Sequence, residues 1–306
     1  MTIGRALTLS RRVAARAAWL GAACAGLAAL VVLALACFEP LPPPLDGGAS
    51  ASSVRVLDRH GRLVRELRTT DGRRTARVRL ADVSPHAIAA LLAAEDGRFR
   101  WHPGLDPLAI ARAAAQAIAS GRVVSGGSTL TQQLARRLVP RPRTLWGKIR
   151  EAAVALRIEA SLDKDEILTE YLNHIEFGPN LTGIEAASRH YFDKPARVLD
   201  LAEAAALVAL VRGPGYYDPR KGVSRLERRR NLVLERLRRT QAADEAAIDR
   251  ALRQPLRIRA AASVSGAEHF AFTIGADVPG ARLPAPPAVL ETTLDLSLQR
   301  DVEAIA

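Results

Sequence analysis

Residues 126–137 of the 306-residue chain read GGSTLTQQLARR, and this stretch sets the pattern for the fold. Two glycines precede a Ser-Thr pair, whose hydroxyls can accept hydrogen bonds from the first backbone N–H groups of a helix. Leucines then recur at helical spacing until a proline stops the run: Leu130, Leu134 and Leu138. The stretch predicts an amphipathic helix over residues 129–139, whose glycine-rich start suits an anion.

Similar helical signals lie on both sides of this stretch. Ser84-Pro85 and Asp106-Pro107 are typical helix starts, because proline is tolerated at the first helical position after a capping side chain. Apolar residues at helical spacing predict further helices over 85–96, 107–119, 144–161, from Asp163 onward, 186–191, 201–211 and 225–239. Apolar residues make up 48% of the chain and aromatic residues 4%, so Ala, Leu and Val must fill the core. Since alanine favours helix, the predicted fold class is mainly α.

Three regions depart from the helical pattern. Residues 39–53 are rich in Pro, Gly and Ser and predict a linker. Residues 54–80 alternate apolar and polar side chains around two turn signals, which predicts a small β element such as a hairpin. Residues 241–306 contain five prolines before a strand-like run, so we expect a linker that leads into something else.

The N-terminal segment predicts a membrane anchor. Residues 17–38 form a run of 22 residues without charge, enough to cross a hydrocarbon core of about 30 Å as a transmembrane helix. Residues 1–16 contain four arginines and no acid, and Glu39 follows the run. Because positive residues stay in the cytoplasm, we expect a basic cytoplasmic tail, a single pass and a domain outside the inner membrane.

Two alternatives to this anchor stay open. A cleaved signal peptide also has a basic start, although its apolar core is usually shorter than this run. Ala34-Leu35-Ala36-Cys37 invites a lipoprotein interpretation, but the large aliphatic residue expected three positions before the cysteine is missing. The chain's two cysteines, Cys24 and Cys37, both lie in the apolar run, so the rest of the chain contains no thiol.

The formal net charge of +12 calls for an acidic partner. Nucleic acid, anionic lipid headgroups and a phosphorylated substrate would each satisfy it, and charge alone does not choose among them.

Polar residues suited to catalysis occur beside three of the predicted helices. Glu95 and Asp96 end an apolar helix, a placement that suits a general base. Lys148 and Glu151 are three residues apart and share one helix face, as in a carboxylate beside a phosphate-holding lysine. Taken singly, each pair also has a structural explanation. Glu95 and Asp96 could simply be a polar helix end, and Lys148 and Glu151 a local ion pair.

The helix of residues 129–139 adds polar side chains away from its leucines. Gln132 and Arg136 are expected opposite the leucine stripe, and Gln133 and Arg137 at its edge. By themselves they would form a solvated face.

Together these stretches closely resemble the peptidoglycan glycosyltransferase domain of class A penicillin-binding proteins, glycosyltransferase family 51. The resemblance covers residues 81–240 and rests on five motifs in the family's order. They comprise Glu95, Asp96, Phe99, His102 and Gly104; residues 126–133; Lys148 and Glu151; residues 164–173; and Arg229, Val233 and Leu234. Gly147 stands where the family has arginine, and Thr169 where it often has glutamate; both departures look like the penicillin-binding protein 1C branch.

The resemblance implies a lysozyme-like, mainly helical fold and a division of roles. Glu95 would take the proton from the acceptor hydroxyl, and Glu151 would orient Lys148 or assist the departing phosphate. The implied substrate-binding residues are Asp96, Phe99, His102, Ser128, Thr129, Gln132, Gln133, Arg136, Arg137, Lys148, Asn173 and Arg229. The resemblance also implies an apolar segment that dips into the membrane, for which residues 116–127 or their neighbours are candidates.

The same resemblance implies the partners and cofactors. The substrates would be lipid II and the growing glycan chain, joined by β-1,4 bonds with inversion at the donor and release of undecaprenyl pyrophosphate. No cofactor is required and no metal site is expected, although a divalent cation, Mg²⁺ or Mn²⁺, could assist the pyrophosphate. The inner membrane and other cell-wall synthesis proteins would be partners, and nucleic acid would not.

Three rival functions stay open. Gly147 and Thr169 motivate a catalytically weak or inactive scaffold of the cell-wall synthesis machinery. A lysozyme-like hydrolase would use carboxylates as well, but would need neither the anchor nor the basic helix. The net charge motivates a nucleic-acid binder, against which the expected external topology argues. Residues 292–300 are similar to the stretch that opens the transpeptidase domain in class A penicillin-binding proteins, so we expect the start of such a domain here.

Overall fold

The computed structural model describes residues 26–27, 29–43, 45, 52–69, 71–121, 127–142, 144–258, 267, 270 and 289–305. The chain divides into two compact units. Unit 1 takes its described residues from Met1–Pro43 and His102–Leu162, and unit 2 from Pro44–Trp101 and Asp163–Ala306. This division runs through the predicted domain of residues 81–240.

Unit 1 is helical. Its elements are a helix at residues 29–38, α3 (Pro107–Ser120), α4 (Leu130–Leu138) and α5 (Leu145–Glu159). α4 packs against α5, and two of its leucines, Leu130 and Leu134, are buried. Val32 of the first helix packs in one apolar cluster with Ala152 and Ala153 of α5. Arg150 on α5 donates to Glu39 at 2.7 Å, which ties the end of the first helix to α5.

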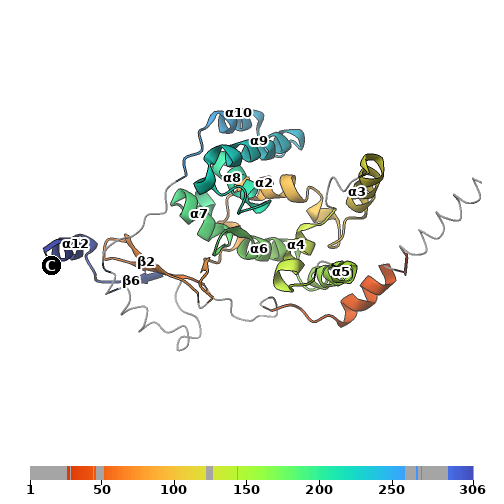
Figure 1. The fold of residues 1–306 in the computed structure, drawn as a ribbon, viewed down its shortest axis with the longest axis horizontal. Coiled ribbons are helices and arrows are strands. Elements are labelled where there is room, and N and C mark those ends of the chain that lie inside the picture. The colour runs from red at the N-terminus through yellow and green to blue at the C-terminus, as the bar shows by residue number, and fades with distance from the viewer. Residues whose placement is uncertain are drawn as a thin grey trace, which may run out of the picture. The chain divides into compact units, whose positions relative to one another are not determined.

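Unit 2 is built around one apolar helix. Its helices are α2 (Pro85–Glu95), α6 (Lys164–His174), α7 (Ile184–Phe192), α8 (Leu201–Val211), α9 (Val223–Arg239) and α10 (Glu245–Arg253). Nine of the eleven residues of α8 are buried, because α2, α7, α9 and α10 all pack against it (Figure 1). A helix that is apolar on every side beyond its first turn is stable in water only when it is covered in this way.

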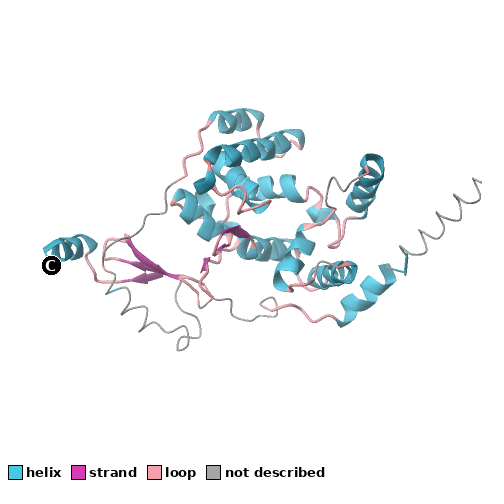
Figure 2. Ribbon diagram, viewed as in Figure 1, coloured by secondary structure: helices cyan, strands magenta, loops and turns pink. Residues whose placement is uncertain are grey.

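The small β element predicted at residues 54–80 is present in unit 2. β1 (Val54–Leu57) and β2 (Leu63–Leu67) form an antiparallel hairpin. The strand-like run near the end of the chain, β6 (Val289–Glu291), joins β1 as a parallel neighbour and precedes α12 (Leu296–Ile305) (Figure 2). A second small sheet has the order β3 (Arg74–Thr75), β5 (Leu181–Thr182), β4 (Glu176–Gly178).

Residues 241–306, predicted as a linker that leads into a further element, include packed elements in their described parts. α10 buries Ile248 and Ala251 against α8 and α9, and β6 completes the hairpin sheet. Proline content pointed to a linker, whereas the buried apolar side chains at helical spacing within α10 decide its packing.

Local sequence signals fix most helix starts. Asp106 accepts from the backbone of Ala109 at 2.9 Å, and Asp163 closes a capping box with Glu166. Ser84 occupies the N-cap position of α2, as predicted, but its hydroxyl donates to the Leu199 carbonyl at 2.8 Å and makes no bond to the helix backbone. Helix ends differ from the expected ones by one or two residues.

The predicted anchor over residues 17–38 lies partly outside the described residues. Among the helices that the structure describes, none has both the length and the apolar character needed to cross a bilayer.

Candidate active site

The start of α4 is held by a capping box. The Thr129 hydroxyl accepts from the Gln132 backbone N–H at 3.2 Å, and the Gln132 side chain accepts from the Thr129 N–H at 3.0 Å. The same hydroxyl donates to the Gly104 carbonyl at 2.5 Å, and both side chains are buried. These contacts give Thr129 and Gln132 a structural role, so Gln132 does not lie on an open face opposite the leucines.

Gly104, whose carbonyl accepts the hydrogen bond from Thr129, lies so close to α5 that only glycine fits there. Gly104 has a positive φ of 87°, and an added Cβ would lie 2.9 Å from Glu159 Cγ and 3.2 Å from the Ala155 carbonyl oxygen. A side chain here would push the loop away from α5. This fit anchors the start of α4 to α5, which carries the charged residues of the site.

A buried carboxylate lies at the centre of a cationic cluster in unit 1. The Glu151 side chain is 0% exposed. Arg136 from the last turn of α4 donates to it through Nε at 2.7 Å, and Lys148 donates from one turn earlier on α5. Arg141, from the connector between the two helices, donates through Nε at 2.9 Å and also through Nη2. Lys148 also donates to the Ser128 hydroxyl at 2.9 Å, which brings the start of α4 into the cluster.

The electrostatics of the cluster make Glu151 an anion. Burial alone would raise the pKa of Glu151, but hydrogen bonds from Arg136, Lys148 and Arg141 outweigh burial and hold that pKa below its ordinary value. Three cations surround one carboxylate, so positive charge is in excess. Since the side chains of Arg136 and Lys148 are 49% and 41% exposed, this excess faces solvent and can meet an anionic ligand.

The residues of the first motif occupy different parts of the molecule. Glu95 is the last residue of α2 and is half-buried, and Asp96 is the C-cap, whose N–H donates to the Leu92 carbonyl at 3.0 Å. Phe99 is buried in unit 2, with the Lys164 ammonium 4.5 Å from its ring centroid. His102 is buried and belongs to unit 1.

Among the remaining predicted residues, Asn173 has a structural role. It is 4% exposed, and its side-chain amide accepts from the Val78 N–H at 2.9 Å and donates to the Val78 carbonyl at 3.0 Å. Both bonds hold the backbone at Val78 against α6, which gives Asn173 a structural contact between distant segments. Arg137 is exposed and Gln133 half-buried on α4, and Arg229 lies half-buried on α9. Gly126 lies outside the described residues.

Arg141 is the functional candidate that sequence reasoning missed. Its signal is the Pro-Arg-Pro run at residues 140–142, since a proline restricts the backbone of the residue before it. A rigid connector can hold an arginine against a neighbouring helix, but only the packing of α4 on α5 shows which carboxylate it meets.

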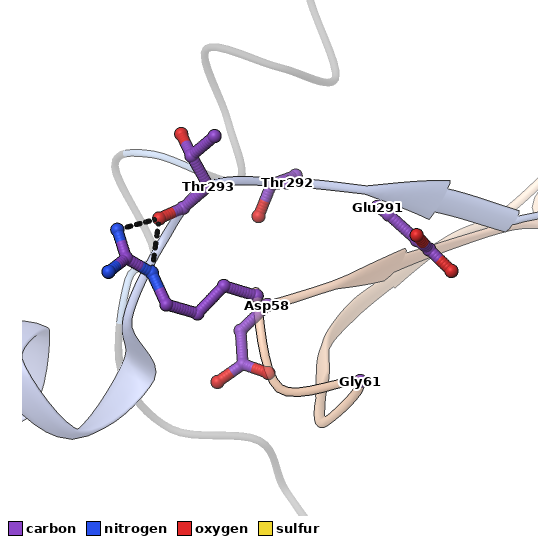
Figure 3. Close-up of a pocket in the computed structure, with 6 residues that line it drawn as sticks. Asp58, Gly61, Glu291, Thr292 and Thr293 are labelled. Carbon is purple, nitrogen blue, oxygen red and sulfur yellow. Dashed lines mark hydrogen bonds between the residues drawn. The ribbon is translucent and has the colours of Figure 1, made fainter.

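A cavity of about 360 Å³ lies elsewhere, at the edge of the hairpin sheet (Figure 3). Asp58 and Gly61 from the β1–β2 turn face Glu291, Thr292 and Thr293 across it. None of the predicted site residues lines this cavity. In the part of the chain that the structure describes, no three His, Cys, Asp or Glu side chains are grouped so that they could hold a metal ion.

Comparisons with known proteins agree with the motif pattern. The family model described as Transglycosylase matches residues 60–238. A protein named biosynthetic peptidoglycan transglycosylase from Nitrosospira multiformis is 38% identical over 187 residues, which cover 61% of this chain and 81% of that protein. Penicillin-binding protein 1C of Escherichia coli is 49% identical over 160 residues, or 52% of this chain and 21% of that protein.

Longer relatives extend beyond the matched region. Penicillin-binding protein 1A of Aquifex aeolicus is 38% identical over 243 residues, which cover 78% of this chain and 33% of that protein. A crystal structure of penicillin-binding protein 1A from Haemophilus influenzae superposes with a TM-score of 0.46 and 21% identity, over 84% of this chain and 29% of that chain. The chain thus spans a third or less of the length of these penicillin-binding proteins and four fifths of the shorter transglycosylase. On the family match and the shorter relative, this chain belongs to the transglycosylase family.

Proposed function

We propose that this chain polymerises lipid II into β-1,4-linked glycan strands of peptidoglycan. The observation that carries the proposal is the buried Glu151 carboxylate with more cations around it than it can neutralise. A lipid-linked disaccharide is joined to its lipid through a diphosphate, which needs this kind of excess positive charge. Family membership supplies the reaction class, since the shorter relative is named a biosynthetic peptidoglycan transglycosylase.

The cluster would act on the donor sugar. As the bond between the donor MurNAc C1 and the diphosphate oxygen breaks, the oxygen keeps the electron pair and negative charge builds up on the leaving group. Arg136 and Lys148 present donors from the half-exposed side of the cluster and would stabilise that charge. Glu151 is an ionised acceptor, which supports the role of orienting the cations over that of donating a proton to the phosphate.

The acceptor sugar needs a base. Glu95 would take the proton from the acceptor GlcNAc 4-hydroxyl while its oxygen forms a bond to C1 on the face opposite the leaving group. One C–O bond forms and one breaks, the proton passes to Glu95, and the anomeric centre inverts from α to β. Asp96, Phe99, His102, Ser128, Gln133, Arg137 and Arg229 remain predicted substrate-binding residues.

The site would work at a membrane surface. α3 has no buried residue although it is mostly apolar, and Leu108, Ile110 and Ile118 are exposed. Exposed apolar side chains of this kind are typical of membrane contacts. We therefore extend the predicted membrane-dipping segment upstream from residues 116–127 to α3. An inner-membrane anchor over residues 17–38, a periplasmic lysozyme-like domain and binding to other cell-wall synthesis proteins complete the proposal.

A divalent cation at the diphosphate, Mg²⁺ or Mn²⁺, belongs to the proposal as an auxiliary group. The arginine and lysine side chains of the cluster already supply positive charge, so we propose that the reaction requires no resident cofactor. Nucleic acid is not a proposed partner.

The deciding experiment is polymerisation of labelled lipid II by the detergent-solubilised chain. Glu95→Gln and Lys148→Ala are the test variants, and Glu245→Gln, at an exposed carboxylate on α10, is the matched control. We expect glycan chains from the wild type and the control, and losses of about a hundredfold or more in the test variants. If the folded wild type makes no chains, the scaffold function replaces this proposal.

A further inference from the structure

The connector between α4 and α5 holds Arg141 in place. Arg141 lies between Pro140 and Pro142, outside every motif of the family resemblance. Pro142 keeps the Arg141 backbone extended, and Pro140 fixes its own φ, so the connector has few conformations to lose on folding. The Pro142 carbonyl accepts from the Thr144 N–H at 2.9 Å and from Arg141 Nη1 at 3.3 Å, which closes the turn into α5.

Arg141 differs from the other two cations in burial. Its side chain is 12% exposed, against 49% for Arg136 and 41% for Lys148. Arg141 donates to one oxygen of Glu151 through two nitrogens, Nε at 2.9 Å and Nη2. It is therefore the buried counter-ion of Glu151, while the other two cations face solvent.

Gly147 makes room for this arrangement. A Cβ at residue 147 would lie far inside contact distance of the Pro142 carbonyl oxygen, and 3.3 Å from both Cδ and Nη1 of Arg141. The first obstacle is a backbone atom that already accepts two hydrogen bonds, so it cannot move without opening the turn. A side chain at position 147 would therefore displace the Pro142 carbonyl and crowd the Arg141 side chain where it meets Glu151.

We infer that Arg141 is a positioning residue for the proposed glycosyl transfer, and that Gly147 is the residue that admits it. By neutralising Glu151 from the buried side, Arg141 leaves Arg136 and Lys148 with positive charge to offer the diphosphate. Without Arg141, Glu151 would draw both cations inward. The identity of the substrate in this inference rests on the proposed function. The contacts of Arg141 and Gly147 do not depend on that function.

The test measures polymerisation by the full chain in detergent, with kcat and KM determined across a pH series. The variants are Arg141→Gln, Arg141→Lys and Gly147→Ala. The matched control is Arg150→Gln, which removes another arginine of α5, one that pairs with Glu39 and not with Glu151. We expect Arg141→Gln to lower kcat by about tenfold or more, with a smaller change in KM.

The pH profile separates positioning from mere structural support. Loss of Arg141 removes one of the three cations that lower the pKa of Glu151, so the acid limb of the kcat profile should move to higher pH. Arg141→Lys should restore part of kcat and of the profile. Gly147→Ala should behave like Arg141→Gln, although alanine favours helix and would by itself strengthen α5. Arg150→Gln should keep the wild-type profile.

Two results would overturn the inference. One is a wild-type kcat and acid limb in Arg141→Gln or in Gly147→Ala. The other is an equal loss at every pH without rescue by lysine, which would mean a structural role only.

A second measurement separates this inference from the proposed function. If the wild type makes no glycan, titration calorimetry with inorganic pyrophosphate tests the cluster directly. Affinity at least about tenfold weaker in Arg141→Gln than in Arg150→Gln supports the inference even though the proposed function fails. Equal affinity overturns it.

Discussion

Replacing Glu151 by glutamine tests the charge balance of the cluster, because glutamine keeps the shape of the side chain and removes its charge. Arg136, Arg141 and Lys148 would then repel one another around an uncharged amide. Breaking a buried ion pair from one side costs about 3–5 kcal/mol. Two of the three cations are about half exposed and can turn to water. We therefore expect a loss of about 2–3 kcal/mol in the free energy of unfolding.

The assay is thermal unfolding of the wild type and Glu151→Gln, with Glu245→Gln as the control. For a chain of 306 residues, with an unfolding entropy of about 2.1 cal/mol/K per residue, such a loss lowers the Tm by about 3–5 °C at neutral pH. The pKa of Glu151 lies below its ordinary value of 4.5 in the folded protein. Its stabilisation is present above about pH 4.5 and disappears as the pH falls through the lowered pKa, so the Tm difference should shrink in acid.

Equal Tm values at neutral pH would refute the reasoning, since the carboxylate would then contribute nothing to holding the cations. A Tm difference that stays constant down to about pH 3 would refute it as well, because the effect could not then arise from the charge of Glu151.

Three further predictions concern other parts of the chain. Asn173→Ala removes both hydrogen bonds to Val78 and should lower the free energy of unfolding by about 2 kcal/mol, with KM unchanged in the polymerisation assay. Ile118→Asp, at a side chain that is 85% exposed, should weaken binding to phospholipid vesicles in a flotation assay and leave the Tm unaltered. Burial raises the pKa of Tyr191 from 10.0 to about 12, so its contribution to stability is present below about pH 10 and is lost as the pH rises towards 12. Tyr191→Phe, which loses the bond to the Phe177 carbonyl, should therefore be less stable by about 1 kcal/mol at pH 7 and should approach the wild type in alkaline denaturation experiments.

Local chemistry explains what was predictable from the sequence. The helix starts at Pro107 and Lys164 follow from the capping side chains of Asp106 and Asp163, which act within one turn. Lys148 and Glu151 are three residues apart, so a single helix brings them together in any fold that contains it. The five motifs likewise identify the family, because each is a short run of the chain.

Tertiary structure decided the rest, because the deciding contacts join residues distant in sequence. β6 pairs with β1 across more than 230 residues, and no local signal can specify that register. Asn173 belongs to a motif, yet its hydrogen bonds to Val78 give it a structural role. Arg141 carries no motif, yet packing of α4 on α5 makes it the buried partner of Glu151. A residue's neighbours along the chain determine its backbone conformation, but the charge and burial that govern its chemistry come from elements brought together by folding.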